Sequence, residues 1–81
     1  MNQYKLPIEI EPLKEGGFLA ICPILQGCHA EGETIAEALE NVEDVARIII
    51  EIMREEKIPL PPAFKAGQSD ELLHEEIFVV A

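Results

Sequence analysis

The sequence has little of what several specialised classes of protein require. Its two cysteines are too few for the disulfide framework of a small secreted domain. No apolar run approaches the ~20 residues that a membrane-spanning helix needs. The residues after Met1 are polar and lack the apolar segment of a signal peptide. These absences predict a cytoplasmic protein that has reduced thiols and does not enter a membrane.

Basic residues are also scarce. The 81 residues include 6 Lys and Arg against 16 Asp and Glu, which gives a net charge of −10. An acidic surface repels phosphate backbones, so direct binding to DNA or RNA is not expected. The same field attracts a basic protein partner and speeds the encounter with it. The charge also keeps a small protein soluble, so composition alone leaves both interpretations open.

The first strand is predicted over residues 4–11, which read "YKLPIEIE". Apolar and mostly polar side chains alternate there, and a period of two is typical of a strand with one solvated face. Pro7 has no N–H group to donate. The strand is therefore expected to lie at a sheet edge or to be unpaired on the side that Pro7 faces.

Turn residues separate three further apolar segments. Gly16 and Gly17 can take positive φ and are expected to form a hairpin turn. A second strand over "GFLAICP" ends at Pro23, and Gly27 closes the connection to a weaker third strand in "CHAEGE". The stretch "LLHEEIFVV", residues 72–80, is rich in apolar and β-branched residues and predicts the last strand.

A long helix is predicted from Thr34. Thr34 and Glu37 fit a capping box: the Thr34 hydroxyl accepts from the N–H of Glu37, and the Glu37 carboxylate accepts from the N–H of Thr34. Apolar residues then recur at helical spacing for about five turns. They are Ile35, Ala38, Leu39, Val42, Val45, Ala46, Ile49 and Met53. The prolines of "IPLPP", residues 58–62, cannot continue the helix.

The predicted order of elements is β-β-β-α-β, in one domain over residues 1–81. Consecutive strands joined by short turns favour an antiparallel meander. The helix and the connector after it allow the fourth strand to return to the same sheet. We therefore expect an α+β fold, in which a small, mostly antiparallel sheet carries one long helix on one face.

Cys22, Cys28 and His29 form the first candidate site. Structural zinc is usually held by four ligands in closely spaced pairs, whereas five residues separate these cysteines. Cys28 and His29 are adjacent in a strand, so their side chains point to opposite faces and cannot easily share an ion. We therefore expect no metal site and interpret the cysteines as small core residues. A nucleophilic pair of Cys22 with His29 across the hairpin stays open.

Acidic residues form the second candidate site. Glu9 and Glu11 share one face of the first strand, and Glu31 and Glu33 share a face near the end of the third. Convergent carboxylates in a cleft would fit a metal-dependent nuclease. All four nevertheless fall where the solvated face of the sheet is expected, which favours an ordinary exposed surface.

The third candidate is a widened apolar arc on the helix. Ile48 lies well off the core-facing stripe, and Ile50 and Ile52 flank it. A helix with so wide an apolar surface usually covers more than one neighbour. Ile48, Ile50 and Ile52 are thus predicted to contact either the connector after the helix or another protein chain. The opposite helix face is mostly acidic and is expected to be solvated.

In order, these motifs resemble those of the HicB-like proteins, the antitoxins of HicA–HicB toxin–antitoxin pairs. The similar part runs from the glycine pair through "GCHAEGETIAEALEN" and the long helix to "IPLPP", within residues 4–62. The matching positions are Gly16, Gly17, Phe18, Pro23, Gly27, Cys28, Gly32, Glu33, Thr34, Glu37, Ala38 and Asn41. The family often has Pro-Asp-Leu-Pro-Gly where this chain has "PILQG".

The resemblance implies a partial ribonuclease H-like fold and a role in neutralising a small ribonuclease toxin of the HicA type. Such a toxin must bind RNA and is expected to be basic, which the net charge of −10 suits. An inhibitor that acts by occlusion needs no catalytic residue and no cofactor. The family often carries a C-terminal DNA-binding domain, whereas the residues after Pro62 here predict only a connector and a strand.

Three functional hypotheses follow from the sequence. The first is a HicB-like antitoxin, a non-catalytic module that binds a basic HicA-type protein. The second is a stand-alone regulatory or ligand-binding domain that forms homo-oligomers, dimers or tetramers. The third is a metal-dependent nuclease that uses the carboxylates of Glu9, Glu11, Glu31 and Glu33.

Overall fold

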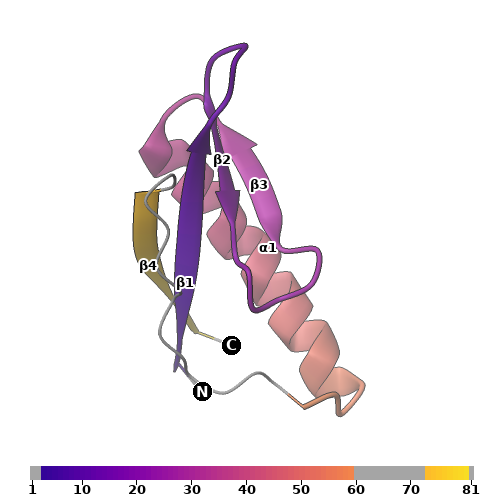
Figure 1. Ribbon diagram of the computed structural model, residues 1–81. Coiled ribbons are helices and arrows are strands. Elements are labelled where there is room, and N and C mark those ends of the chain that lie inside the picture. Colours follow the sequence, from indigo (N-terminus) through magenta and orange to yellow (C-terminus); the bar gives the residue numbers. More distant parts are fainter. Residues whose placement is uncertain (1–2, 60–72, 81) are drawn as a thin grey trace.

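A computed structural model of the chain describes residues 3–59 and 73–80. The elements are β1 (Gln3–Pro12), β2 (Phe18–Ile21), β3 (His29–Gly32), α1 (Ile35–Glu55) and β4 (Leu73–Val80). The strands form one sheet in the order β3-β2-β1-β4, and all three pairings are antiparallel (Figure 1). The predicted β-β-β-α-β order and α+β class are therefore confirmed.

β1 is an inner strand and not an edge strand. Its residues Glu9–Pro12 pair with β2, and its residues Gln3–Ile10 pair with β4. The N–H of Leu13 donates to the C=O of Gly17 on the β2 side at 3.0 Å. Backbone N–H groups point alternately to the two sides of a strand, so the nitrogen of Pro7 points to the same side as the N–H of Leu13. The pairing with β2 ends at Glu9, so β2 does not pair with Pro7 on that side. Of the two predictions for Pro7, the edge strand is wrong and the unpaired side is the one the structure supports.

The sheet face that the alternation predicted to be solvated is not exposed along its whole length. Glu11 is exposed, but Glu9 is half-buried and the side chain of Pro7 is fully buried. The period-two pattern therefore places Leu6, Ile8 and Ile10 correctly in the core but is wrong for Pro7. Pro7 has no charge or polar side-chain group, so its burial costs much less free energy than burial of the charged side chains on this face.

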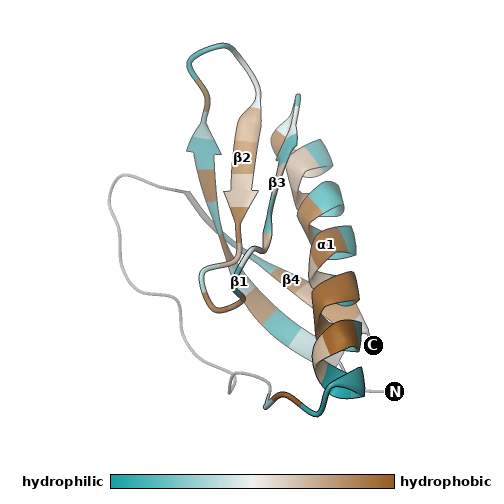
Figure 2. Ribbon diagram, turned by 90° about the vertical axis from the view of Figure 1, so that its right-hand side faces the viewer, coloured by the Kyte–Doolittle hydropathy of each residue, from teal (hydrophilic) through white to brown (hydrophobic). Residues whose placement is uncertain are grey.

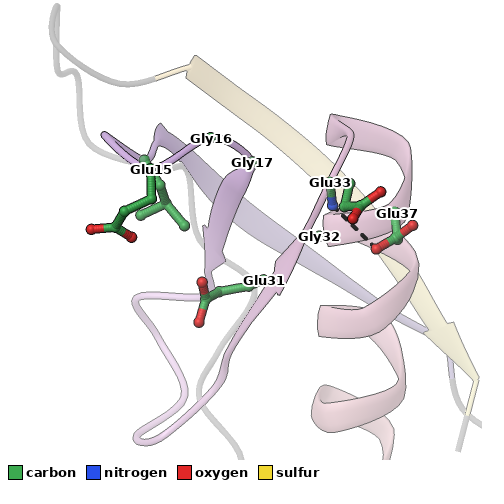
Figure 3. A pocket seen from close by; sticks show the side chains of 8 residues that line it. Glu15, Gly16, Gly17, Glu31, Gly32, Glu33 and Glu37 are labelled. Carbon is green, nitrogen blue, oxygen red and sulfur yellow. Dashed lines mark hydrogen bonds between the residues drawn. The ribbon is translucent and has the colours of Figure 1, made fainter.

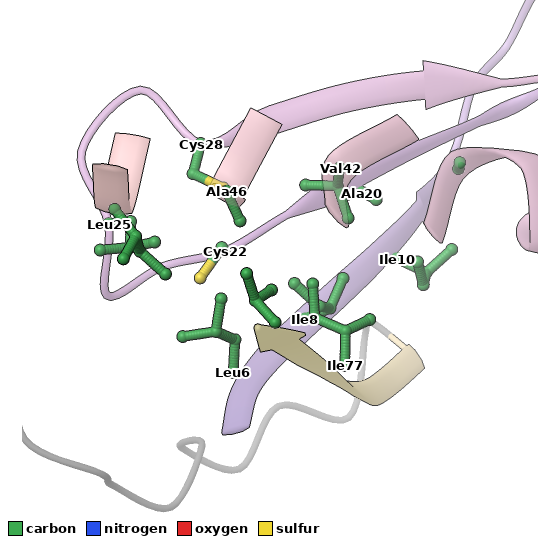
Figure 4. Close-up of a cluster of buried hydrophobic side chains, with 13 residues drawn as sticks. Leu6, Ile8, Ile10, Ala20, Cys22, Leu25, Cys28, Val42, Ala46 and Ile77 are labelled. Atoms are coloured by element: carbon green, nitrogen blue, oxygen red, sulfur yellow. The ribbon is translucent and has the colours of Figure 1, made fainter. Parts of the chain in front are cut away.

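α1 covers one face of the sheet, and the core lies between them (Figure 2). The buried apolar residues come from every element except β3, and from the β2–β3 loop (Figure 4). They are Leu6, Ile8, Ile10, Ala20, Cys22, Leu25, Cys28, Ala38, Val42, Ala46, Ile50, Ile77 and Val79. Asn41 also ties the helix to the edge of the sheet, since its Nδ2 donates to the C=O of Glu31 at 2.8 Å.

The two ends of α1 are closed by different hydrogen bonds. At its start, Thr34 Oγ1 accepts from the N–H of Glu37 at 3.0 Å, as predicted. Glu37 Oε1 accepts from the N–H of Glu33 at 3.1 Å, and not from that of Thr34. The capping box is therefore displaced by one residue, because the extended backbone at Thr34 leaves the preceding N–H within reach.

At its end, Lys57 takes a left-handed conformation with φ of 56°. The N–H of Ile58 donates to the C=O of Met53 at 2.8 Å, and the N–H of Lys57 donates to the C=O of Arg54 at 3.2 Å. This is the Schellman arrangement, in which the residue after the cap is usually glycine. The predicted turn glycines Gly16 and Gly17 also have positive φ, at 101° and 87°.

Candidate protein-binding surface

Two isoleucines on α1 form an exposed apolar strip. Ile48 is 57% exposed and Ile52 is 51% exposed. They are four residues apart, so their side chains are neighbours on one side of the helix. We call Ile48 and Ile52 the isoleucine strip. Figure 2 shows the apolar character of this half of α1.

Ile50 does not belong to this strip. Its side chain is only 1% exposed and lies in the core with Val42 and Ala46. The prediction that Ile50 contacts a partner is therefore wrong. It lies on the opposite side of the helix from Ile48, since two residues correspond to about 200° of rotation.

An apolar groove lies on the same half of the helix. It has a volume of about 420 Å³ and is lined by Ile24, Leu25 and Gln26 of the β2–β3 loop and by Ile49, Met53, Ile58 and Pro59. Ile58 is itself 48% exposed. Sequence reasoning missed Ile24 and Ile58, because it interpreted them only as parts of a connection and of a helix-ending segment. The signal was present, since each is a large apolar residue beside turn residues.

Acidic side chains surround the isoleucine strip. Asp44, Glu51 and Glu55 lie one helical turn from Ile48 or Ile52, and all three are exposed. Arg47 pairs with Asp44 at 3.0 Å and with Glu43 at 3.4 Å. In residues 3–59 and 73–80, no ion pair forms at Glu51 or Glu55. The surface thus combines an apolar centre with acidic side chains, and Arg54 lies beside Glu51 and Glu55.

The structure places Cys22 and Cys28 in the core, where they are 1% and 2% exposed. The N–H of Cys22 donates to the C=O of Cys28 at 2.8 Å, so the two residues face each other across the β2–β3 hairpin. His29 is exposed, pairs with Ile21 and projects from the opposite face. The sheet therefore separates His29 from Cys22, and the nucleophilic pair that the sequence left open is not formed.

The four predicted nuclease carboxylates do not converge. Glu11 and Glu31 share the face away from α1, but Leu19 of β2 stands between them in the register. Glu33 lies beyond the end of β3. Glu31 and Glu33 do line a depression with Glu15 and Glu37, yet Figure 3 shows the Glu15 and Glu31 carboxylates directed away from the other two. The described part of the chain holds no group of three or more residues suited to a metal ion.

Comparison with known proteins identifies the family. No protein-family model matches the sequence. UPF0150 protein ssl0259 of Synechocystis sp. is 44% identical over 55 residues, which cover 68% of this chain and 75% of that protein. UPF0150 protein ssl0738 of the same organism is 31% identical over 70 residues, or 86% of this chain and 88% of that protein. The chain belongs to the UPF0150 family.

Antitoxins are also similar to this UPF0150 protein. Antitoxin HicB 1 of Photorhabdus laumondii is 37% identical over 63 residues, which span 75% of this chain but 41% of that antitoxin. The N-terminal domain of Burkholderia pseudomallei antitoxin HicB shares the fold, with a TM-score of 0.72 and 18% identity over 90% of this chain and 94% of that one. A chain of the HicA3 and HicB3 toxin-antitoxin complex has a TM-score of 0.62 and 26% identity, over 94% and 95% of the two chains.

These similarities confirm the resemblance to the HicB-like antitoxins that the sequence motifs indicated. In the part of the chain that the structure describes, no helix has the length and apolar character of a membrane span.

Proposed function

We propose that this UPF0150 protein binds a small basic toxin of the HicA type in the cytoplasm and neutralises it by covering part of its surface. The similarity to a chain of the HicA3 and HicB3 complex supports this, since 94% of the present chain aligns with it at 26% identity. Neutralisation by occlusion requires a complementary surface and no catalytic group. It therefore involves no cofactor, no metal ion and no direct contact of this chain with nucleic acid.

The observation that carries the proposal is the isoleucine strip inside its acidic surroundings. An apolar centre with a polar rim is the usual anatomy of an interface between separately folded proteins. Glu51 and Glu55 are exposed beside Ile48 and Ile52, and the whole chain carries a charge of −10. Such a surface attracts a basic partner and repels an acidic one.

Binding measurements with surface variants test the proposal. The probe is any small basic HicA-type protein that the neighbouring reading frame encodes, and the variant is the double substitution Ile48→Ser with Ile52→Ser. Central apolar residues of an interface usually carry much of its affinity, so the double variant is expected to weaken binding at least about tenfold. Phe78→Ser is the matched control, because Phe78 is 54% exposed in β4 and lies away from α1.

The control variant is expected to bind like the unchanged protein. Equal affinities for all three proteins would rule out the isoleucine strip as the contact surface. No binding by the unchanged protein, in a preparation whose probe is folded and active as a ribonuclease, would contradict the toxin-binding proposal itself.

The same exposed isoleucines favour a second candidate, a homo-oligomeric domain in which the strip meets a second copy. The two candidates respond oppositely to salt. Screening weakens the attraction between an acidic protein and a basic partner, but it relieves the repulsion between two acidic copies. Self-association that strengthens with added salt and disappears in the double variant would favour the dimer or tetramer. Sedimentation of a monomer at all salt concentrations would exclude it.

A further inference from the structure

Cys22 and Cys28 form a matched pair at the base of the β2–β3 hairpin. The ladder of β2 and β3 ends at the pair of Ile21 with His29, and Cys22 and Cys28 are the next residues beyond it. Their backbones are joined by the 2.8 Å hydrogen bond from the N–H of Cys22 to the C=O of Cys28. Residues opposite each other project from the same face, and Figure 4 shows both side chains in the core.

The surroundings of the two sulfurs differ. A hydrogen bond from the Cys28 thiol and the backbone N–H groups of Ile24 and Leu25, acting against burial, lower the pKa of Cys22 below its ordinary value of 9.0. The N–H of Leu25 also donates to the C=O of Cys22 at 3.3 Å. The same hydrogen bond, together with burial and the nearby Cys22 charge, raises the pKa of Cys28. Of the two thiols, that of Cys22 therefore loses its proton first.

We propose that Cys22 and Cys28 are a reversible redox pair that closes an intrachain disulfide across the β2–β3 hairpin. Cys22 and Cys28 make one of the two backbone hydrogen bonds of an antiparallel pair, since the N–H of Cys28 donates to the C=O of Leu25. Opposed residues of antiparallel strands have Cα atoms about 4.5–5.5 Å apart, inside the range of ~4.4–6.8 Å that disulfides span. The bond therefore needs side-chain rotation and little movement of the backbone. This inference stands on the hairpin alone and does not depend on the toxin-binding proposal.

The reaction is a thiol–disulfide exchange with a small disulfide such as glutathione disulfide. The Cys22 thiolate attacks one sulfur of the oxidant, the oxidant's S–S bond breaks, and one glutathione leaves as a thiolate. Cys28 then gives up its proton to that leaving thiolate and attacks Cys22 Sγ, which releases the second glutathione. The protein loses two electrons and two protons, and one glutathione disulfide becomes two glutathione molecules.

The disulfide would act on the apolar groove beside the isoleucine strip. The loop between the two cysteines carries Ile24, Leu25 and Gln26, which line that groove. A covalent bond across its base holds this wall of the groove in place, and reduction releases it. Both thiols are buried, so the oxidant reaches them only when the loop between them opens.

Redox titration of the full chain tests the proposal. The protein is equilibrated without denaturant in buffers with graded ratios of glutathione to glutathione disulfide. The exchange is then quenched with an alkylating agent, and the mass of the intact protein is measured by mass spectrometry. The expected product is a monomer lighter by two hydrogen atoms that takes up no alkyl group and reverts with dithiothreitol. Its unfolding temperature is expected to rise by on the order of 5–10 °C, because the closed loop restricts the unfolded chain.

The single variants Cys22→Ser and Cys28→Ser identify the roles. With Cys28→Ser, the remaining thiol is expected to stop at a mixed disulfide with one glutathione, and with Cys22→Ser modification is expected to be slower. Two alkylated thiols at the most oxidising ratio in native buffer, with oxidation only in urea, would overturn the proposal. Oxidised dimers in place of the lighter monomer would also overturn it. Because both results come from the unchanged protein, poor folding of a variant does not decide the matter.

Discussion

Gly32 of β3 passes so close to the first turn of α1 that a methyl group on it would stand 2.8 Å from the Cα of Ala38. Glycine at this position therefore sets how closely the helix can approach the sheet. The approach also brings Asn41 within 2.8 Å of the C=O of Glu31, which accepts its side-chain hydrogen bond. The contact between β3 and α1 is thus limited by backbone and not by side-chain packing.

Replacement of Gly32 by alanine is expected to destabilise the fold by about 3 kcal/mol, because the added methyl group meets helix backbone that cannot move aside alone. Urea unfolding followed by circular dichroism measures the effect. Glu33→Ala is the neighbouring control, since its side chain is exposed, and a change within about 0.5 kcal/mol is expected. Similar stabilities of the two variants would show that α1 can shift away from β3 at little cost.

Ile50 and Ile48 offer a matched pair of the same residue type on one helix. Ile50→Ala removes a fully buried side chain and is expected to cost about 3 kcal/mol. Ile48→Ala changes a side chain that is 57% exposed and is expected to alter stability by less than about 0.5 kcal/mol. Thermal and urea unfolding of both variants check this. A comparable loss from Ile48→Ala would mean that the isoleucine strip is covered within the chain.

Lys57 occupies a backbone conformation that suits glycine. Its φ of 56° crowds the Cβ of any L-residue, so Lys57→Gly is expected to stabilise the protein by about 0.5–1 kcal/mol. Glu56→Gly is the control, because Glu56 has a negative φ of −84° and gains nothing from glycine there. Its stability should stay the same or fall by up to about 1 kcal/mol. A loss for both variants would indicate that the Lys57 side chain stabilises the helix end.

Hydrophobic periodicity was enough to predict the order of elements and most of the core. The period of two located Leu6, Ile8 and Ile10, and the helical spacing located Ala38, Val42 and Ala46, because these residues lie at the centre of the contact between sheet and helix. The turn glycines followed from their backbone freedom. These properties are local, so the sequence carries them directly.

What sequence reasoning missed depends on tertiary contacts. Pro7 is buried although the alternation placed it on the solvated face, and its strand has a neighbour on each side. Ile50 is different: it follows Ala46 by four residues and continues the buried row of Ala38, Val42 and Ala46, so the helical spacing already indicated its burial. The failure of the predicted nuclease site also follows from strand order, since β2 separates Glu11 from Glu31. A linear sequence shows spacing along a strand but not which strand lies between two others.

The cysteine pair is expected to give the reduced protein a pH-dependent stability with a maximum near pH 9. The native pKa of Cys22 lies below the ordinary value of 9.0, and that of Cys28 lies above it. Between the native pKa of Cys22 and 9.0, the unfolded chain binds more protons at this pair than the native one, so stability rises with pH. Above 9.0 the unfolded chain has lost both protons while native Cys28 keeps its own, so stability falls.

Urea unfolding under reducing conditions, below, at and above pH 9.0, measures this dependence. The double variant Cys22→Ser with Cys28→Ser is the reference, because it retains every other titrating group. The difference in unfolding free energy between the unchanged protein and this variant is expected to rise and then fall. A difference that decreases steadily with pH would mean that burial outweighs the hydrogen bonds to Cys22 Sγ. It would show that neither thiol ionises readily in the native hairpin.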